Sequence, residues 1–359
     1  MATKTLSENI NQAISDFNSI KQAIIDKGVQ VPSGTKTSEY GAKIGEIQGG
    51  SGGLDTSGVT NFYQFCYGNR FNDQLDKIDT RSGTDFAYMF NECSSLTTMP
   101  HINTSNGTSF RYMFNYCSNL TTIPKLDTSQ GTNFSYMFYN CSNLINIPQL
   151  DTSSGNNFNY MFSGCKKLTT IPQLDTSSGI NVNAMLQNCI KLTNIPKINT
   201  SKATDFGNMF GGCSKLTTIP QLDTSSGINF SNMFSSCSTL TTIPQLDTSR
   251  GNSFSSMFYR CLKLTTINLS SFYSSNNMFE GCVALENLNV TGTIKVKNNY
   301  LNLSSSKNLT VESLLNVLNA LSDNTSVSTT YKITLGSTNL AKLTDEQKQI
   351  AINKNYTLA

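Results

Sequence analysis

Ten cysteines are the residues whose chemistry and spacing stand out first in this chain. Eight of them recur at a constant interval of 24 residues: Cys93, Cys117, Cys141, Cys165, Cys189, Cys213, Cys237 and Cys261. Clustered metal sites need closely spaced cysteine pairs, often with histidine, yet no two cysteines here lie closer than 21 residues apart. We therefore expect no metal site and no cofactor. Because free cysteine packs as a small hydrophobe, the spacing predicts a column of buried, reduced thiols.

The other chemistry-bearing groups predict no catalytic site. His101 is the only histidine and stands where other copies of the repeat have Gln or Lys, which indicates a surface variant rather than a base. Asp-Thr-Ser recurs because every turn needs it, so its carboxylates are predicted to cap helices. No phosphate-binding loop, dinucleotide-binding glycine pattern or nucleophile motif occurs in the sequence. We expect the protein not to be an enzyme.

A line of tyrosines is the binding site that the sequence suggests. They occupy one repeat position in four successive copies, just outside the predicted core face, and are Tyr88, Tyr112, Tyr136 and Tyr160. Later copies carry Ala, Asn or Ser at this position. Aromatic rings cover sugar faces while nearby amides and hydroxyls bond them, which favours a glycan ligand. The alternative is that each ring simply packs on the next rung.

A 24-residue repeat must position these groups. The sequence Asp-Thr-Ser-x-Gly-x-x-Phe-x-x-Met-Phe-x-x-Cys-x-x-Leu-Thr-Thr-Ile-Pro-x-Leu returns eight times, with variations. A fixed period of this length indicates a solenoid, in which each copy buries its apolar side against its neighbours. The fold class predicted is an α/β solenoid that resembles leucine-rich repeats, with a narrow parallel sheet on one side and short helices or helical turns on the other.

The copy that begins at Asp127 shows how one rung is expected to form. The apolar residues from Phe134 to Leu144 have the spacing of one helix face, and Gly131 helps the chain turn into that helix. Residues 144–148 indicate a short strand that ends in proline. Because proline cannot donate to a sheet ladder, the strand must stop or leave the sheet there.

The first, the last and one internal copy depart from the pattern. In the first, Cys66 falls where the repeat has its Phe, and in the last, Cys282 follows Cys261 by only 21 residues. In the copy that begins at Asp175, Val and Leu replace both Phe residues, which predicts compensated repacking of the core.

The core of each copy resembles the BspA-like leucine-rich repeats of bacterial and phage-encoded surface proteins. Their signature is a Met-Phe-x-x-Cys-x-x-Leu-x-x-Leu core followed by Phe-Asp-Thr-Ser, and the likeness covers residues 55–290. The last copy has the standard leucine-rich spacing at Leu264, Ile267, Leu269 and Phe272. The earlier copies differ by one residue. The resemblance implies a leucine-rich-repeat-like fold and leaves the function open.

Two flanking segments resemble modules of phage tail proteins. Residues 27–47 are similar to a module found at the N-terminal side of tail proteins from phages of Gram-positive bacteria. Residues 335–359 are similar to the ends of phage tail and baseplate proteins, in which a Gly-Trp pair usually stands where this chain has Asn355 and Tyr356. These resemblances imply a receptor-binding component of a virion.

Four regions follow from these patterns: an N-terminal helical anchor (1–48), a Gly-rich linker (49–54), the solenoid (55–290) and an α+β C-terminal cap (291–359). The anchor carries a narrow apolar seam made by Leu6, Ile10, Ala13, Phe17, Ile20 and Ile24. Such a seam favours either self-association, as a homo-oligomer such as a trimer, or docking onto another protein. In the cap, Thr344 to Gln347 form a capping box that predicts the start of a last helix.

Charge and hydropathy exclude two classes of partner. The net charge is only +3 and 14% of the residues are charged, which does not fit a nucleic-acid-binding protein. No stretch of 18 apolar residues occurs, so we expect no membrane insertion. The N-terminus has no apolar signal-peptide core, which predicts synthesis in the host cytoplasm.

Three functions remain open from the sequence. The first is a phage tail or baseplate protein of the virion, whose N-terminus binds other virion proteins and whose solenoid binds a host-surface glycan or protein for adsorption. The second is a BspA-like adhesin on a bacterial surface. The third is a purely structural virion protein.

Overall fold

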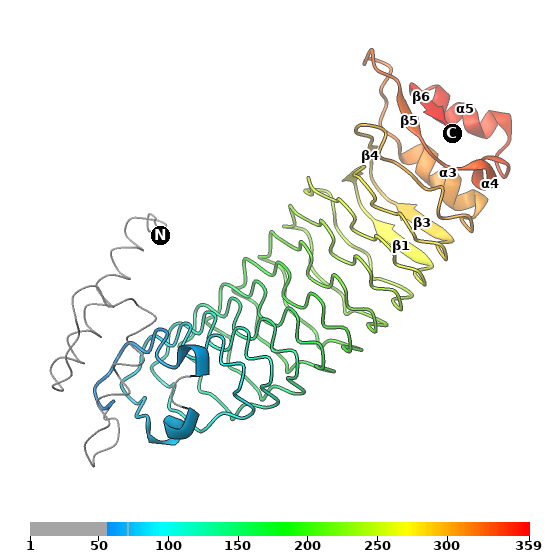
Figure 1. Cartoon of the computed structure of the whole chain (residues 1–359). Helices are drawn as coiled ribbons and strands as arrows, with labels where there is room; N and C mark the ends of the chain where they lie inside the picture. Colours follow the sequence, from blue (N-terminus) through cyan, green and yellow to red (C-terminus); the bar gives the residue numbers. More distant parts are fainter. Residues whose placement is uncertain (1–55, 70–71) are drawn as a thin grey trace, which may run out of the picture.

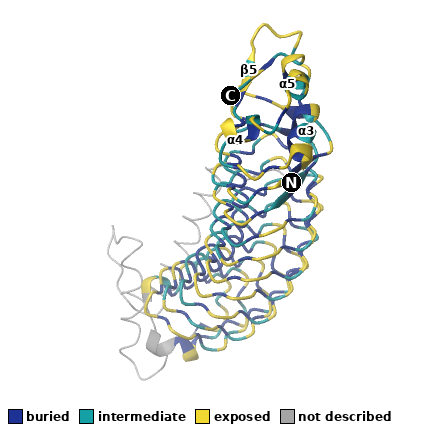
Figure 2. Ribbon diagram, turned by 90° about the vertical axis from the view of Figure 1, so that its right-hand side faces the viewer, coloured by how far each residue is buried: buried dark blue, intermediate teal, exposed yellow. Residues whose placement is uncertain are grey.

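A computed structural model describes residues 56–69 and 72–359. Over these residues the chain winds into a solenoid of stacked rungs and ends in a small cap of helices and strands (Figure 1). The rungs follow a curved axis, and buried and exposed residues alternate along them (Figure 2). The buried hydrophobic residues form one core cluster that extends along the solenoid. The predicted repeat solenoid is confirmed. The predicted anchor and linker lie outside the described residues.

Backbone hydrogen bonds alternate between two directions along the Phe-to-Cys segment of each rung. In one copy, the N–H groups of Phe134 and Tyr136 donate to carbonyl oxygens of the next rung at 3.0 and 2.9 Å. The N–H of Met137 instead donates to the Phe134 carbonyl of its own rung at 3.2 Å. The same alternation continues as far as Cys141. Every second N–H therefore joins neighbouring rungs, and the others close tight turns.

The predicted helix from Phe134 to Leu144 is wrong, and this alternation is the reason. An α-helix directs its N–H groups to carbonyls within the same helix, so it leaves none for the next rung. The chain instead places a residue with positive φ at two positions of this segment that are four residues apart, Tyr136 (57°) and Asn140 (56°). Among the described residues, α-helices occur only within residues 311–352. The solenoid itself consists of turns and short parallel pairings.

Gly131 has a different role from the one predicted. It does lie in a turn, since its N–H donates to the Thr128 carbonyl at 2.8 Å. However, a Cβ at this position would lie 2.6 Å from the Phe134 ring and 2.9 Å from the Thr128 oxygen. Glycine at this position therefore allows the close approach of the aromatic ring, and the one copy with Ala203 here follows a copy that has Val182 in place of Phe.

Two columns of stacked phenylalanines fill the core. In the first, the rings of Phe110, Phe134 and Phe158 follow one another with centroids 5.7 and 5.8 Å apart. In the second, the rings of Phe114 and Phe138 are 5.4 Å apart. All of these side chains are buried, and full burial of one such ring stabilises the fold by about 1.5–3 kcal/mol. Each copy thus completes the core of its neighbours.

The cysteines form a third buried column, as predicted. All ten are free and buried. The Cys141 thiol donates to the Phe114 carbonyl at 3.0 Å, and the thiols of other copies repeat this contact across the rungs. Burial raises the pKa of Cys213 to about 12. These thiols therefore stay protonated and act as packing groups and weak donors.

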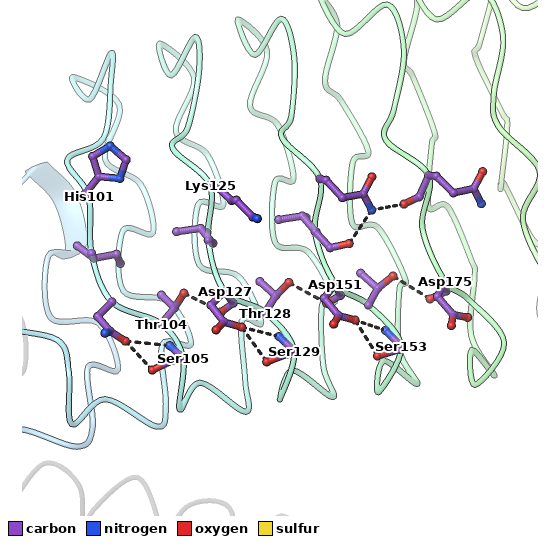
Figure 3. A pocket seen from close by; sticks show the side chains of 17 residues that line it. His101, Thr104, Ser105, Lys125, Asp127, Thr128, Ser129, Asp151, Ser153 and Asp175 are labelled. Atoms are coloured by element: carbon purple, nitrogen blue, oxygen red, sulfur yellow. Dashed lines mark hydrogen bonds between the residues drawn. The ribbon is translucent and has the colours of Figure 1, made fainter.

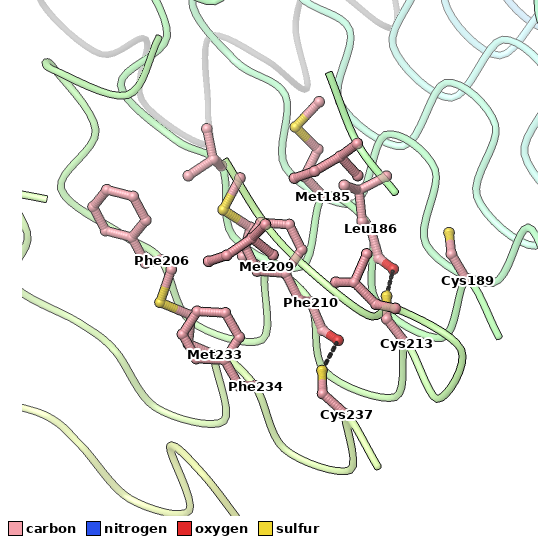
Figure 4. Close-up of a cluster of buried hydrophobic side chains, with 14 of the residues drawn as sticks. Met185, Leu186, Cys189, Phe206, Met209, Phe210, Cys213, Met233, Phe234 and Cys237 are labelled. Carbon is pink, nitrogen blue, oxygen red and sulfur yellow. Dashed lines mark hydrogen bonds between the residues drawn. The ribbon is translucent and has the colours of Figure 1, made fainter. Parts of the chain in front are cut away.

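The variant copy keeps the same core with different side chains. Val182, Met185 and Leu186 are all buried, and the Leu186 carbonyl accepts the Cys213 thiol at 3.1 Å, as the Phe carbonyl does in other copies (Figure 4). Leu186 therefore replaces Phe without changing the register of the rungs. This agrees with the compensated repacking predicted for this copy.

Proline explains why regular strands are short. Next to Ile-Pro, neighbouring copies are joined by a single backbone hydrogen bond, such as that from the Ile145 N–H to the Thr121 carbonyl at 3.1 Å. The last copy has Asn268 at the proline position and forms strand β1 (Thr266–Leu269). β1 pairs in parallel with β3 (Asn287–Val290). The next pair along the chain is β2 (Phe272–Tyr273) with β4 (Ile294–Lys295). Removal of proline thus restores the ladder that proline interrupts.

The two ends of the solenoid are capped differently. Near the start, two short 3₁₀ helices span Tyr67–Asn69 and Asn72–Lys77. At the other end, helix α3 (Val311–Ala320) continues the stack. Thr310, the residue that caps its N-terminus, donates its N–H to the Glu286 carbonyl of the preceding rung at 2.9 Å. The predicted α+β character of this end is present in the structure.

The remaining cap elements pack beyond α3 (Figure 1). They are strand β5 (Tyr331–Ile333), helix α4 (Ser337–Leu340), helix α5 (Asp345–Ile352) and strand β6 (Tyr356–Leu358). β5 and β6 pair in parallel. The predicted capping box at Thr344 and Gln347 is confirmed by both of its hydrogen bonds.

Buried threonines tie each rung to the next. In Asp-Thr-Ser, the hydroxyl of Thr128 donates to the Asp151 carbonyl at 2.7 Å, and the same contact recurs in five other internal copies. Thr248 is equally buried, but its hydroxyl has no partner. The copy that follows Thr248 is three residues shorter than the others.

This difference predicts unequal costs for the same substitution. Thr128→Val should lower the free energy of unfolding by about 1–2 kcal/mol, because it leaves a buried carbonyl without its donor. Thr248→Val should be neutral or stabilising, since it replaces an unpaired hydroxyl by a methyl group. Guanidinium unfolding followed by circular dichroism compares the two. Equal losses in both variants would contradict the assigned role of the hydroxyl.

Candidate functional site

The four predicted tyrosines form one continuous stack, which we call the tyrosine column. Its members are Tyr88, Tyr112, Tyr136 and Tyr160. Successive ring centroids lie 4.5, 4.3 and 4.6 Å apart, with interplanar angles of 4–8°. Each side chain is half-buried. The structure therefore brings together all four residues that the repeat pattern singled out.

The backbone of the tyrosine column lies in the left-handed region. The φ angles of the four residues are between 56° and 59°. Left-handed backbone costs an ordinary L-residue about 1–2 kcal/mol, whereas Asn tolerates it better. At the same repeat position, Asn208 and Asn232 have φ of 56° in rungs of the same shape. The fold therefore does not require tyrosine at this position.

Further aromatic and cationic groups widen this surface. The guanidinium of Arg111 lies 5.0 Å from the Tyr112 ring centroid. Tyr139 lies beside the column, 5.4 Å from Tyr136, and Tyr116 meets Tyr139 edge-on at 5.4 Å. Tyr116 is about half exposed, at 47%. Sequence reasoning missed these three residues because they occupy other positions of the repeat, so a search along one column cannot find them.

Stacking decides which parts of the tyrosine column a ligand can reach. Within the stack each ring covers the face of the next, so ring edges and hydroxyls remain for contact. The stack ends at Tyr160, because the next copy has Ala184 in its place. Burial, followed by the neighbouring tyrosines, raises the pKa of Tyr136 to about 12. The Tyr136 hydroxyl is therefore a neutral donor and acceptor at physiological pH.

A shallow groove of about 1030 Å³ follows the Pro-x-Leu-Asp-Thr-Ser segments of successive copies (Figure 3). Along it, the Gln149 side-chain amide donates to the Gln173 carbonyl at 2.5 Å, and the Gln173 amide donates to the Lys197 carbonyl at 2.6 Å. His101 is exposed at one end, as predicted for a surface variant. The glutamine amides of the groove are therefore used to join rungs.

The carboxylates along this groove stabilise turns. Asp127 accepts the backbone N–H of Ser129 at 3.1 Å and its hydroxyl at 2.7 Å (Figure 3). These bonds, the hydroxyl first, hold the pKa of the Asp127 carboxyl below its usual value, and the same holds for Asp175. The predicted capping role is therefore correct in kind, but the group capped is a turn instead of a helix.

Metal-binding groups and membrane-spanning helices can be assessed for residues 56–69 and 72–359. In this part of the chain, no group of three or more His, Cys, Asp or Glu side chains is arranged to hold a metal ion. None of its helices has the length and apolar character needed to cross a membrane. The six predicted anchor residues, Leu6, Ile10, Ala13, Phe17, Ile20 and Ile24, lie outside the described residues.

Comparison with known proteins points to a repeat family. The sequence profile described as "Mycoplasma protein of unknown function, DUF285" matches residues 36–144, 108–218 and 190–292, which together make up more than half of the chain. No curated protein matches the sequence. One matching solved structure is "Crystal structure of TLR13-ssRNA13 complex", at 13% identity and a TM-score of 0.27. That match covers 75% of this chain and 45% of the other, and a likeness this distant carries no functional argument.

Titration of the tyrosine hydroxyls tests the packing of the column. Burial raises the pKa of Tyr88 and Tyr136 from 10 to about 12. Because the folded protein favours the protonated form, this contribution to stability is present below pH 10 and is lost as the pH rises toward 12. Spectrophotometric titration should show late-ionising tyrosines, and Tyr88→Phe with Tyr136→Phe should reduce that fraction. An unchanged titration curve would argue against buried hydroxyls in the column.

Proposed function

Because this chain belongs to the family described as "Mycoplasma protein of unknown function, DUF285", its function must be argued from its surface, and we propose that the tyrosine column recognises a glycan on a cell surface. The observation that carries the proposal is the restriction of four stacked tyrosines to consecutive copies, at a position where later copies keep the same left-handed backbone with Ala, Asn or Ser. Strained backbone is retained where a side chain is needed for another purpose. The binding surface is therefore assigned to the copies that have tyrosine.

The later copies provide the comparison within the same molecule. Asn208 and Asn232 have the same φ, and their backbone N–H groups donate to the next rung at 2.8 Å, as those of the tyrosines do at 2.9 Å. Two of these later rungs therefore fold with the residue that suits the backbone better. Ring stacking offsets part of the strain, because an aromatic pair contributes about 0.5–1.5 kcal/mol. Stacking does not explain why tyrosine occupies this repeat position only in copies near one end of the solenoid.

The chemistry of the exposed groups favours a sugar polymer. Ring edges supply apolar contact, and neutral phenol hydroxyls can both donate and accept hydrogen bonds. Arg111 adds a guanidinium beside Tyr112. At the end of the stack, a pyranose ring beside Tyr160 would continue the column over the small Ala184. Several sugars in a row could thus contact several rungs.

We further propose that the protein is a phage tail or baseplate component. In this arrangement residues 1–48 attach to other virion proteins and oligomerise, while the solenoid faces the host. The support is the resemblance of the two flanking segments to tail proteins. In the C-terminal segment, Asn355 has φ of 65° where the similar proteins usually have Gly, and Tyr356 is buried where they have Trp. These two positions fit the same local structure.

Binding to host cells tests the tyrosine column directly. Tyr112→Asn together with Tyr136→Asn should reduce cell binding at least tenfold, because two central rings are removed. The free energy of unfolding should change by no more than about 1–2 kcal/mol, since lost stacking is offset by relief of left-handed strain. Flow cytometry with fluorescent protein measures binding, and thermal unfolding measures stability.

The matched control for this experiment is Asn208→Ser with Asn232→Ser, at the same repeat position in later copies. It should leave cell binding unchanged. Unchanged binding by the tyrosine variant, or a loss of stability large enough to unfold it, would show that the column is a packing element only.

Truncation tests the attachment to a particle. Removal of residues 1–50 should leave a folded solenoid that still binds cells but no longer enters virions, as measured by immunoblot of purified particles. Assembly of the truncated protein would contradict the anchor. The competing function is a bacterial surface adhesin. Immunogold labelling of bacterial envelopes with bare particles would support that function instead.

A further inference from the structure

A second column of like residues lies directly after the cysteines in four of the five later copies, and the copy with Cys237 has Thr239 instead. We call it the lysine column, and its members are Lys166, Lys167, Lys191, Lys215 and Lys263. All five side chains are exposed. The corresponding positions of the first three internal copies carry only Ser and Asn. The lysine column therefore begins in the copy in which the tyrosine column ends, the one containing Tyr160.

Buried neighbours fix the direction and the register of the lysine column. In the sequence Cys-x-Lys-Leu-Thr, the Cys and Leu side chains are buried and the Lys between them is exposed. Two residues later, the N–H of Thr193 donates to the Thr169 carbonyl, and that of Thr217 donates to the Thr193 carbonyl. Adjacent rungs joined in this way lie about 4.8 Å apart. Lys167, Lys191 and Lys215 therefore follow one another in line, one on each rung.

The charge of this line is not balanced locally. None of the five ammonium groups forms an ion pair or a hydrogen bond with the residues that the structure describes. The Cys-to-Ile segments of these copies, from residues 165–171 to residues 261–267, contain no Asp or Glu. Like charges on adjacent rungs repel one another. A partner with regularly spaced negative charges would relieve this repulsion.

Earlier copies show that the fold does not need lysine here. At the same repeat position, the Asn143 amide donates to the side-chain oxygen of Asn119 on the neighbouring rung at 3.2 Å. The Asn119 amide in turn donates to the Ser94 carbonyl at 2.8 Å. The later copies give up this ladder of hydrogen bonds and place repelling charges in its stead. The exchange is unfavourable for stability, which indicates a different use for the lysines.

From this arrangement we infer that the lysine column binds a linear polysaccharide that carries anionic groups on successive sugars. The polymer lies along the solenoid axis, with its charges against Lys167, Lys191 and Lys215. This inference rests on the proposed function and deepens it, because it names the charge of the glycan. The same chain of sugars can then reach Tyr160, which lies in the copy that contains Lys166 and Lys167.

Binding of full-length protein to polygalacturonate, a linear polymer with one carboxylate per sugar, tests the inference. Lys167→Gln with Lys191→Gln and Lys215→Gln should weaken binding roughly tenfold, as expected for three exposed ion pairs. Binding of the unsubstituted protein should also weaken steeply as salt is raised. The matched control is Lys197→Gln with Lys202→Gln and Arg250→Gln, which removes three charges elsewhere on the solenoid and should leave binding unchanged.

Several results would overturn the inference. They are equal weakening in both triple variants, absence of binding to polygalacturonate, equal binding to neutral dextran, and tighter binding to single-stranded oligo(dT). Thermal unfolding of both variants establishes that each remains folded. If the tyrosine variant loses cell binding while the lysine variant binds polygalacturonate normally, the proposed function stands and the lysine column has no part in it.

Discussion

Hydrogen bonds between rungs are the constraint from which the rest of this structure follows. Each rung must offer backbone N–H groups to its neighbour, yet it must also curve sharply enough to close around two phenylalanine columns. The chain meets both demands by alternating bonds to the next rung with bonds inside its own turns. This alternation goes with two left-handed residues in each rung, four positions apart, as at Tyr136 and Asn140. The bonds between rungs therefore limit which residue types are favourable at these surface positions.

The interior could be predicted from sequence because burial repeats with the chain. The 24-residue period identified the solenoid, and the regular cysteines identified a buried column. The proline position also gave the correct reason for short strands, as Asn268 and β1 demonstrate. The helix was predicted wrongly because the apolar spacing from Phe134 to Leu144 suits both a helix face and a series of turns. The Asn and Gly residues at the left-handed positions were the signal that separates the two.

The candidate site was predictable only in part, for a related reason. A column of identical residues is visible in sequence when its members share one repeat position, as the four tyrosines do. Tyr116 and Tyr139 occupy different positions, and only their edge-on contact at 5.4 Å shows that they belong to one surface. The stacking distances likewise could not be derived from sequence, because they depend on rungs being joined by hydrogen bonds. The anchor residues lie outside the described part of the chain, so their role stays a prediction.

The repeat also distinguishes residues that the fold needs from residues that serve another purpose. A residue needed by the rung should recur in every copy, because each copy has the same backbone and the same buried neighbours. Phe, Met, Cys and Leu recur in this way with few exceptions. Tyrosine and lysine do not, and each occupies positions where other copies fold with Asn, as at Asn232 and Asn143. In both cases Asn suits the local structure better, through its left-handed backbone or its ladder of hydrogen bonds. These departures from Asn are the positions at which we propose contacts between the solenoid and another molecule.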